Sequence, residues 1–180
     1  MSLVLTALLA ATLGQAQPAD PVDQRLQDRL DQLSFASSED AAPLVAEIRA
    51  LWESDASDTS IHLMDQGLLA ETAGRLDIAA RMYDHVNRYE PEFAEAWLRT
   101  ARVAAAQQDW GYALESLDRV ITLEPRRFDA YVMLGNFLEQ TRELQAAQEA
   151  YREALELYPN YDTARSAYLR VQRELEGRSL

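Results

Sequence analysis

Two pairs of arginines have the types and spacing that most plainly suggest ligand chemistry in this 180-residue sequence. Arg99 and Arg102 are three residues apart, and so are Arg170 and Arg173. On a helix, side chains with this spacing lie one turn apart on the same face. A guanidinium group donates two parallel hydrogen bonds to a carboxylate. The two pairs therefore predict a site for a ligand that carries carboxylate groups.

Each of these arginines could instead neutralise an acidic neighbour, because surface ion pairs are common and individually weak. The acids concerned are Glu95, Asp129 and Glu139. For a single arginine this alternative is slightly the stronger one. A group of arginines along one channel favours ligand binding.

Catalysis and metal binding find no support in the residue pattern. The sequence contains no Cys, which excludes thiolate catalysis, disulfides and thiolate metal sites. His62 and His85 are the only imidazoles, and their helical phases place them on opposite faces, so they cannot share a metal. The acidic loop 53–60 lacks the glycine turn and the closing glutamate of a calcium loop. We therefore expect a protein that is not an enzyme and that holds no cofactor or metal.

Charge and the first residues suggest where the protein acts. The net charge is −13, and every cation is Arg, which disfavours nucleic acid and anionic membranes as partners. Residues 1–16 carry no charged side chain, and the apolar run 3–13 is shorter than the roughly 20 residues that a membrane-spanning helix needs. This pattern predicts a signal peptide cleaved after Ala16, a periplasmic or secreted protein, and no transmembrane anchor.

The elements that must position the arginines repeat with a period of 34 residues. Small residues and prolines keep this spacing, as in Ala79, Ala113 and Ala147, and in Pro91, Pro125 and Pro159. Such a period indicates stacked helical hairpins. We expect units at 60–93, 94–127 and 128–161, in which small residues let paired helices approach and each proline ends a second helix.

These positions resemble the tetratricopeptide repeat (TPR) family, whose pattern opens W-x2-L-G-x2-Y, continues through Ala, Phe and Ala positions, and ends in Pro. The third unit matches best, through Tyr131, Leu134, Gly135, Leu138, Ala147, Tyr151, Ala154 and Pro159. The second unit departs at Thr100 and Ala104, and the first at Gln66. The stretches LMDQG (63–67), PEFAEAW (91–97) and SLDRVITLEPRRF (116–128) resemble a narrower group of small exported bacterial TPR proteins. The resemblance implies an all-α, right-handed superhelix, an α-α solenoid of about nine helices.

In this family the first helix of each unit faces a concave channel and the second forms the convex back. Carried onto this sequence, the resemblance implies a peptide-binding channel lined by Met64, Leu68, Leu98, Arg99, Arg102, Val132, Asn136, Arg170 and Arg173. Chaperone-binding relatives hold a carboxylate with a Lys and an Asn on one helix. Met64 with Leu68, and Leu98 with Arg102, stand at those places, so a chaperone C-terminus is not the expected ligand.

Both ends of the stack should be closed by additional helices. Residues 22–53 show helical periodicity, as in Leu26, Leu30 and Leu33, and predict a degenerate hairpin that covers the open end before the first unit. Residues 162–177 predict a capping helix with a polar outer side.

The function expected from these features is a non-enzymatic protein–protein interaction scaffold in envelope assembly. It would bind an extended peptide or a partner helix in its concave channel. The alternative is a self-associating structural protein that uses its end caps or its convex face.

Overall fold

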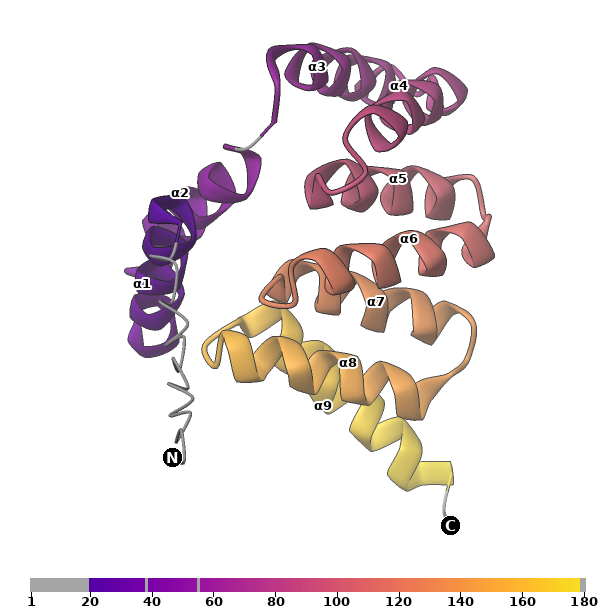
Figure 1. Ribbon diagram of the computed structural model, residues 1–180. Helices are drawn as coiled ribbons and strands as arrows, with labels where there is room; N and C mark the ends of the chain where they lie inside the picture. The colour runs from indigo at the N-terminus through magenta and orange to yellow at the C-terminus, as the bar shows by residue number, and fades with distance from the viewer. Residues whose placement is uncertain (1–19, 38, 55, 179–180) are drawn as a thin grey trace, which may run out of the picture.

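The computed structural model describes residues 20–37, 39–54 and 56–178, and within these ranges it contains helices and no strand. Figure 1 shows the nine helices of this part of the chain. They are α1 (Pro21–Phe35), α2 (Ala41–Glu53), α3 (Asp58–Thr72), α4 (Leu76–Tyr89), α5 (Ala94–Ala106), α6 (Trp110–Leu123), α7 (Phe128–Gln140), α8 (Leu144–Leu157) and α9 (Asp162–Arg178). The predicted signal peptide at residues 1–16 lies outside the described residues.

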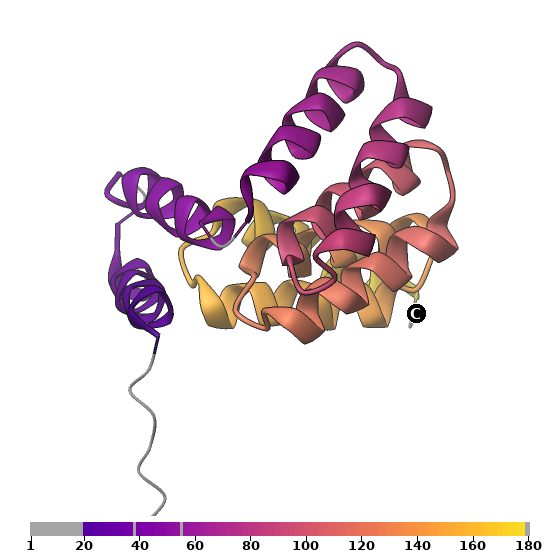
Figure 2. The same cartoon turned by 45° about the horizontal axis from the view of Figure 1, so that its top comes forward.

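Helices α3 to α9 form one stack. α3 packs against α4, α5 against α6, and α7 against α8, and each hairpin packs on the next (Figure 1). α9 packs on α8, where Ala164, Ala167 and Val171 are buried, and so closes the far end. Figure 2 shows α1 and α2 beside this stack rather than in line with it. Within the described ranges, none of the helices combines the length and the apolar character that spanning a membrane requires.

Small side chains set the distance between paired helices. Ala79, Ala113 and Ala147 have no exposed surface, which confirms their predicted place between the helices. A β-carbon added at Gly67 would lie 2.3 Å from Cε1 of Tyr83. The third unit repeats this arrangement, because a β-carbon at Gly135 would lie 2.4 Å from Cε1 of Tyr151. In these two units a tyrosine ring lies directly on the backbone of the first helix.

The turns inside the three units share one backbone conformation. The second residue after the first helix has a positive φ in each, of 70° at Gly74, 64° at Gln108 and 67° at Arg142. The next backbone N–H closes the turn onto the end of the helix, as when Asp109 N donates to Ala104 O at 2.9 Å. Only glycine adopts this conformation without strain, so Gln108 and Arg142 hold it at a cost of about 1 kcal/mol each.

The position of the N-terminal hairpin corrects the sequence analysis. The hairpin of α1 and α2 was expected to cover the open end of the first unit, but it folds back along the stack. Its apolar face joins a core with Phe128 and Tyr158, which lie at the starts and ends of later helices. The Trp52 ring is 5.4 Å from that of Phe128, and Asn160 Nδ2 donates to the backbone oxygen of Ala36 at 2.8 Å.

This placement has a physical reason and a consequence. The start of α7 and the turn before α9 present an aromatic cluster of Phe128, Tyr158 and Tyr161, and the hairpin's leucines pack in the same core. α3 consequently keeps large apolar side chains in solvent, with Leu68 43% and Leu69 62% exposed. The hairpin instead supplies a side wall to the inner face of the stack.

Candidate functional site

Two adjoining cavities follow the inner face of the stack, and together they form what we call the inner channel. The first, of about 330 Å³, lies between α2, α5 and α7. The second, of about 160 Å³, lies between α3 and the start of α5. Both are lined by Glu53, Glu95 and Arg99, so these three residues form a wall that the two cavities share. The floor comes from the first helices of the units, and α2 of the hairpin forms the wall.

Most of the predicted channel residues line this space. Met64 and Leu68 line the smaller cavity, Arg99 lines both, and the larger one is lined by Leu98, Arg102, Val132 and Asn136. Arg170 and Arg173, on α9, line neither cavity. Leu98 and Val132 are each only 6% exposed, so they contribute to the floor more than to a contact surface.

The predicted arginines already hold carboxylates of the protein itself. Arg99 Nε donates to Glu95 at 2.6 Å. Arg102 donates through Nε and Nη2 to the two oxygens of Glu71, at 2.7 and 2.9 Å. Although burial opposes the charged form, the hydrogen bonds and charge of Arg102 hold the pKa of Glu71 below its usual value.

Arg102 and Arg170 each belong to a set of three residues, and the two sets have the same arrangement. Each set joins the first helix of one unit to the first helix of the next. Tyr83 Oη donates to Glu71 at 3.0 Å, and Arg102 of the following unit completes the set. Burial, followed by the Glu71 carboxylate, raises the pKa of Tyr83 to about 12. We call this set the Glu–Tyr–Arg tie, and its role is to fasten successive hairpins together.

The second Glu–Tyr–Arg tie lies at the far end of the stack. Tyr151 Oη donates to Glu139, and Arg170 Nη2 donates to the same carboxylate at 2.6 Å. The three residues stand 68 positions after Glu71, Tyr83 and Arg102, which is two full periods. That spacing was visible in the sequence, and comparing polar positions across units would have revealed the tie. Tyr151 Oη also lies 2.8 Å from the side-chain amide of Asn136. The fourth predicted arginine, Arg173, donates through Nε to the backbone oxygen of Leu169 at 3.1 Å.

Sequence reasoning missed the buried arginine of the site, Arg127. Its side chain is 1% exposed, and it donates to both oxygens of Asp129 at 3.0 Å and to Glu95 at 2.8 Å. Its guanidinium carbon lies 4.2 Å from the centroid of the Trp52 ring, a cation–π contact with the hairpin. The sequence did contain a signal for Arg127. The positions 34 residues before and after it hold the aromatic residues Phe93 and Tyr161, so an arginine there departs from the repeat pattern.

A second residue that was missed is Arg49 on α2. It is exposed and lines the larger cavity, opposite the α5 and α7 side chains. Among the described residues it has no hydrogen bond or ion pair of its own, although its charge acts on Glu53 and Tyr161. A hairpin at the end of the stack, as the sequence predicts, would hold Arg49 away from the channel. It is the guanidinium most available to a ligand in the inner channel.

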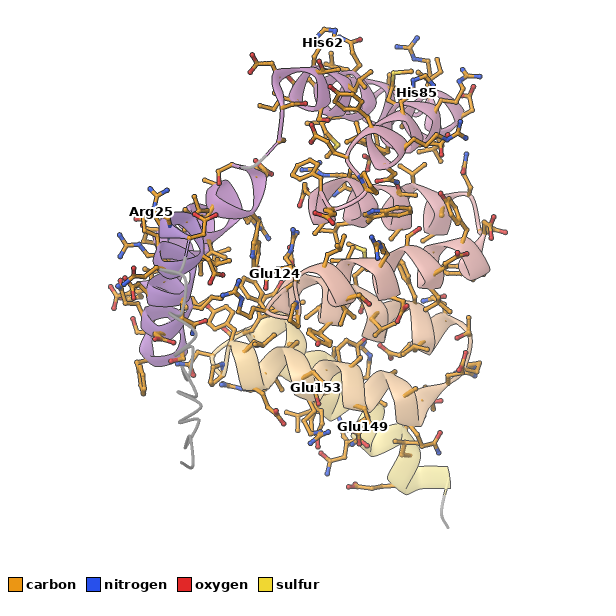
Figure 3. The ribbon with its side chains drawn as sticks, in the orientation of Figure 1. Arg25, His62, His85, Glu124, Glu149 and Glu153 are labelled. Carbon is orange, nitrogen blue, oxygen red and sulfur yellow. The ribbon has the colours of Figure 1, made fainter. Side chains whose placement is uncertain are left out.

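The two histidines lie away from this channel. Figure 3 shows His62 on α3 and His85 on α4 at the outer end of the stack, where both are exposed. In the described part of the chain, no three His, Asp or Glu side chains gather closely enough to hold a metal ion.

The chain is similar in sequence and in structure to known proteins with tetratricopeptide repeats. The tetratricopeptide repeat profile matches residues 64–111 and 101–162. A TPR repeat-containing protein of Rhizobium etli is 27% identical over 155 residues, which span 86% of this chain and 76% of the relative. The first TPR domain of Spaghetti (RPAP3), solved with the HSP90 peptide SRMEEVD, has a TM-score of 0.64 at 20% identity, covering 67% of this chain and 96% of that one. MamA has a TM-score of 0.61 at 28% identity, covering 66% of this chain and 64% of that one.

These findings confirm the resemblance and the right-handed superhelix that it implied. The two profile matches together extend over more than half of the sequence and coincide with the stacked hairpins α3 to α8. The chain therefore belongs to the tetratricopeptide repeat family.

Proposed function

We propose that this protein is a non-enzymatic interaction scaffold that binds an extended peptide or a partner helix in the inner channel. The observation that carries the proposal is the unpaired guanidinium of Arg49, which lines the larger cavity, where the other cations are already paired. A ligand carboxylate would meet two free donors there at no cost in broken internal ion pairs.

The channel has two chemically distinct ends. The smaller cavity is lined by Ile61, Met64 and Leu68, of which Ile61 is 46% and Leu68 43% exposed. The larger cavity carries Arg49 and Arg102. A segment with an apolar side chain at one end and a carboxylate at the other would match both. The acidic peptide SRMEEVD in the Spaghetti complex supports the general mode, in which a peptide binds a stack of this kind.

The test uses peptides selected from a random display library on the immobilised protein. Arg49→Glu should lower the affinity of the selected peptides at least tenfold, because it replaces the free guanidinium by a carboxylate that repels the ligand's carboxylate. Arg25→Glu is the matched control, since Arg25 is an exposed arginine of the same hairpin that lines neither cavity of the channel (Figure 3). Equal losses in the two variants would refute the placement of the ligand.

The alternative, self-association through the end of the stack, is favoured by one observation, the uncovered outer side of α3. Leu69 is 62% exposed and lines neither cavity of the channel, whereas its neighbour Leu68 lines the smaller cavity. Under the channel proposal, Leu68→Glu loses peptide binding and Leu69→Glu keeps it. Under the alternative, light scattering shows a dimer that Leu69→Glu converts to a monomer.

We propose that the protein acts in the bacterial periplasm or outside the cell. Its proposed role there is in envelope assembly. The support is the uncharged, apolar sequence of residues 1–16. Mass spectrometry of the protein from a bacterial host should find Gln17 at the N-terminus. An intact first residue in the cytoplasmic fraction would contradict this location.

A further inference from the structure

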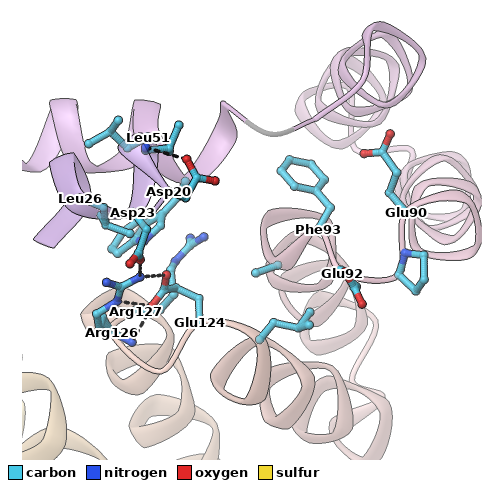
Figure 4. A pocket seen from close by; sticks show the side chains of 15 residues that line it. Asp20, Asp23, Leu26, Leu51, Glu90, Glu92, Phe93, Glu124, Arg126 and Arg127 are labelled. Carbon is cyan, nitrogen blue, oxygen red and sulfur yellow. Dashed lines mark hydrogen bonds and ion pairs between the residues drawn. The ribbon is translucent and has the colours of Figure 1, made fainter. Parts of the chain in front are cut away.

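A separate cavity of about 510 Å³ lies at the seam between the hairpin and the stack, and we call it the seam cavity (Figure 4). One wall comes from α1 and α2 and the other from the turns before α5 and α7. Carboxylates stand on both walls, at Asp20 and Asp23 of the hairpin side and at Glu90, Glu92 and Glu124 of the stack side. The inner channel lies on another side of Arg127, which lines both spaces.

The cations of the seam do not balance these acids. Arg126 donates to Asp23 at 2.6 Å and to Glu124 at 2.7 Å, so it bridges one pair across the seam. Arg127 turns its donors toward Glu95 and Asp129 of the inner channel. Glu92 has no partner among the described residues. The two acidic walls therefore repel each other wherever Arg126 does not stand between them.

Two further features show what would fill this space. Beneath the acidic rim the walls are apolar, with Leu26, Leu51 and Phe93 among the lining residues. Two buried donors of residues that line this cavity have no hydrogen-bond partner among the described residues, Trp52 Nε1 and Arg127 Nη1. Trp52 is 9% and Arg127 1% exposed, and both line the cavity. A buried donor without an acceptor is unfavourable, because it has lost water and gained no partner, so both groups favour an incoming oxygen.

We propose that the seam cavity binds an extended peptide segment through a lysine or arginine side chain. The alkyl stem packs between Leu26 and Phe93, and the charged head reaches the carboxylate of Glu92. A main-chain carbonyl, a neutral acceptor that the acidic rim does not repel, takes the hydrogen bond from Trp52 Nε1. That nitrogen is covered in the free protein, so the entering segment displaces a neighbouring side chain to reach it. This site is distinct from the inner channel, whose proposed ligand carries the opposite charge.

The experiment uses an alanine-based peptide with two arginines and its twin with citrulline, which keeps the shape and lacks the charge. Fluorescence anisotropy with the full chain should show at least tenfold tighter binding of the arginine peptide. Glu92→Gln should weaken it three- to tenfold, and Glu92→Arg should abolish it. Glu115→Gln, which removes an exposed acid of α6 outside the seam, is the matched control and should change nothing.

A second readout locates the bound peptide. In an amide correlation spectrum the indole N–H signal of Trp52 should move, while that of Trp110, which packs on Phe137 far from the seam, should stay. Equal affinity of the citrulline twin, equal losses in the two glutamine variants, or an unmoved Trp52 signal would each overturn the proposal. Leu68→Glu should leave the arginine peptide bound, so failure of the inner channel and failure of the seam cavity are separable.

Discussion

Replacing Gly67 with alanine tests how closely the paired helices approach. In an ordinary helix interior, Gly→Ala stabilises by about 1 kcal/mol, because glycine loses more backbone entropy. Here the new β-carbon would lie 2.3 Å from Cε1 and 2.8 Å from Cζ of Tyr83. The ring has no exposed surface, and its hydroxyl is held by Glu71, so it cannot swing away freely. Overpacking of this kind is unfavourable by about 1–3 kcal/mol, and we expect a net loss of about 1–2 kcal/mol.

The middle unit supplies the compensating change. At the positions that correspond to Gly67 and Tyr83 it has Ala101 and Leu117, and both are fully buried. Leucine lacks the ring that lies over the helix backbone, so alanine is tolerated opposite it. In a Tyr83→Leu background, Gly67→Ala should therefore stabilise the protein by about 1 kcal/mol. The two changes should be coupled by about 2–3 kcal/mol, within the range found for residues in contact.

Urea unfolding of the four proteins, followed by circular dichroism at 222 nm, measures this coupling. Comparing the Gly67→Ala step in the two backgrounds cancels the separate loss of the hydrogen bond from Tyr83 to Glu71. A neutral or stabilising effect of Gly67→Ala in the natural background would refute the close approach. Additive effects would show that the ring and the β-carbon do not meet.

Three other changes test the tie, the turns and the seam. Glu71→Gln should lower the unfolding free energy at pH 7 by about 1 kcal/mol. The folded-state pKa of Glu71 is depressed, so its contribution to the unfolding free energy is present above pH 4.5 and is lost as the pH falls through the folded-state pKa. The difference in stability between Glu71→Gln and the natural protein should therefore disappear in urea titrations at acid pH. Gln108→Gly should raise the unfolding free energy by about 1 kcal/mol, and Gly74→Ala should lower it similarly, since both have positive φ. Equal thermal stability would contradict the strain at these turns. Arg127→Met should lower the unfolding free energy by about 3 kcal/mol, because Asp129 loses its ion pair and the buried Glu95 keeps only Arg99. The cation–π contact with Trp52 is lost as well, so Trp52 fluorescence should shift to the red, and an unchanged spectrum would contradict that contact.

The periodic part of the structure was predictable because its determinants are local. The spacing of Ala79, Ala113 and Ala147 defines which helix faces touch, and neighbouring helices in a stack are neighbours in sequence. The hairpin was misplaced because its partners are distant in sequence, with Asp23 bonded to Arg126 and Ala36 to Asn160. A sequence pattern over neighbouring residues cannot specify contacts between residues more than 100 positions apart. Most of the channel lining followed from the family resemblance, but positions in a repeat could not show which arginines already pair with carboxylates of the protein.

The position of the hairpin and the pairing of the arginines together move the proposed site. Arg102 and Arg170, which the sequence assigns to a ligand, each complete a Glu–Tyr–Arg tie between units. The site that we propose therefore relies on a cation outside the periodic units, and the folded-back hairpin provides one in Arg49. Arg127 is one of the residues that hold the hairpin there, since it contacts Trp52 on one side and Glu95 on the other. The degenerate segment, which has the weakest repeat signal, therefore completes the inner channel, and the regular units supply its floor.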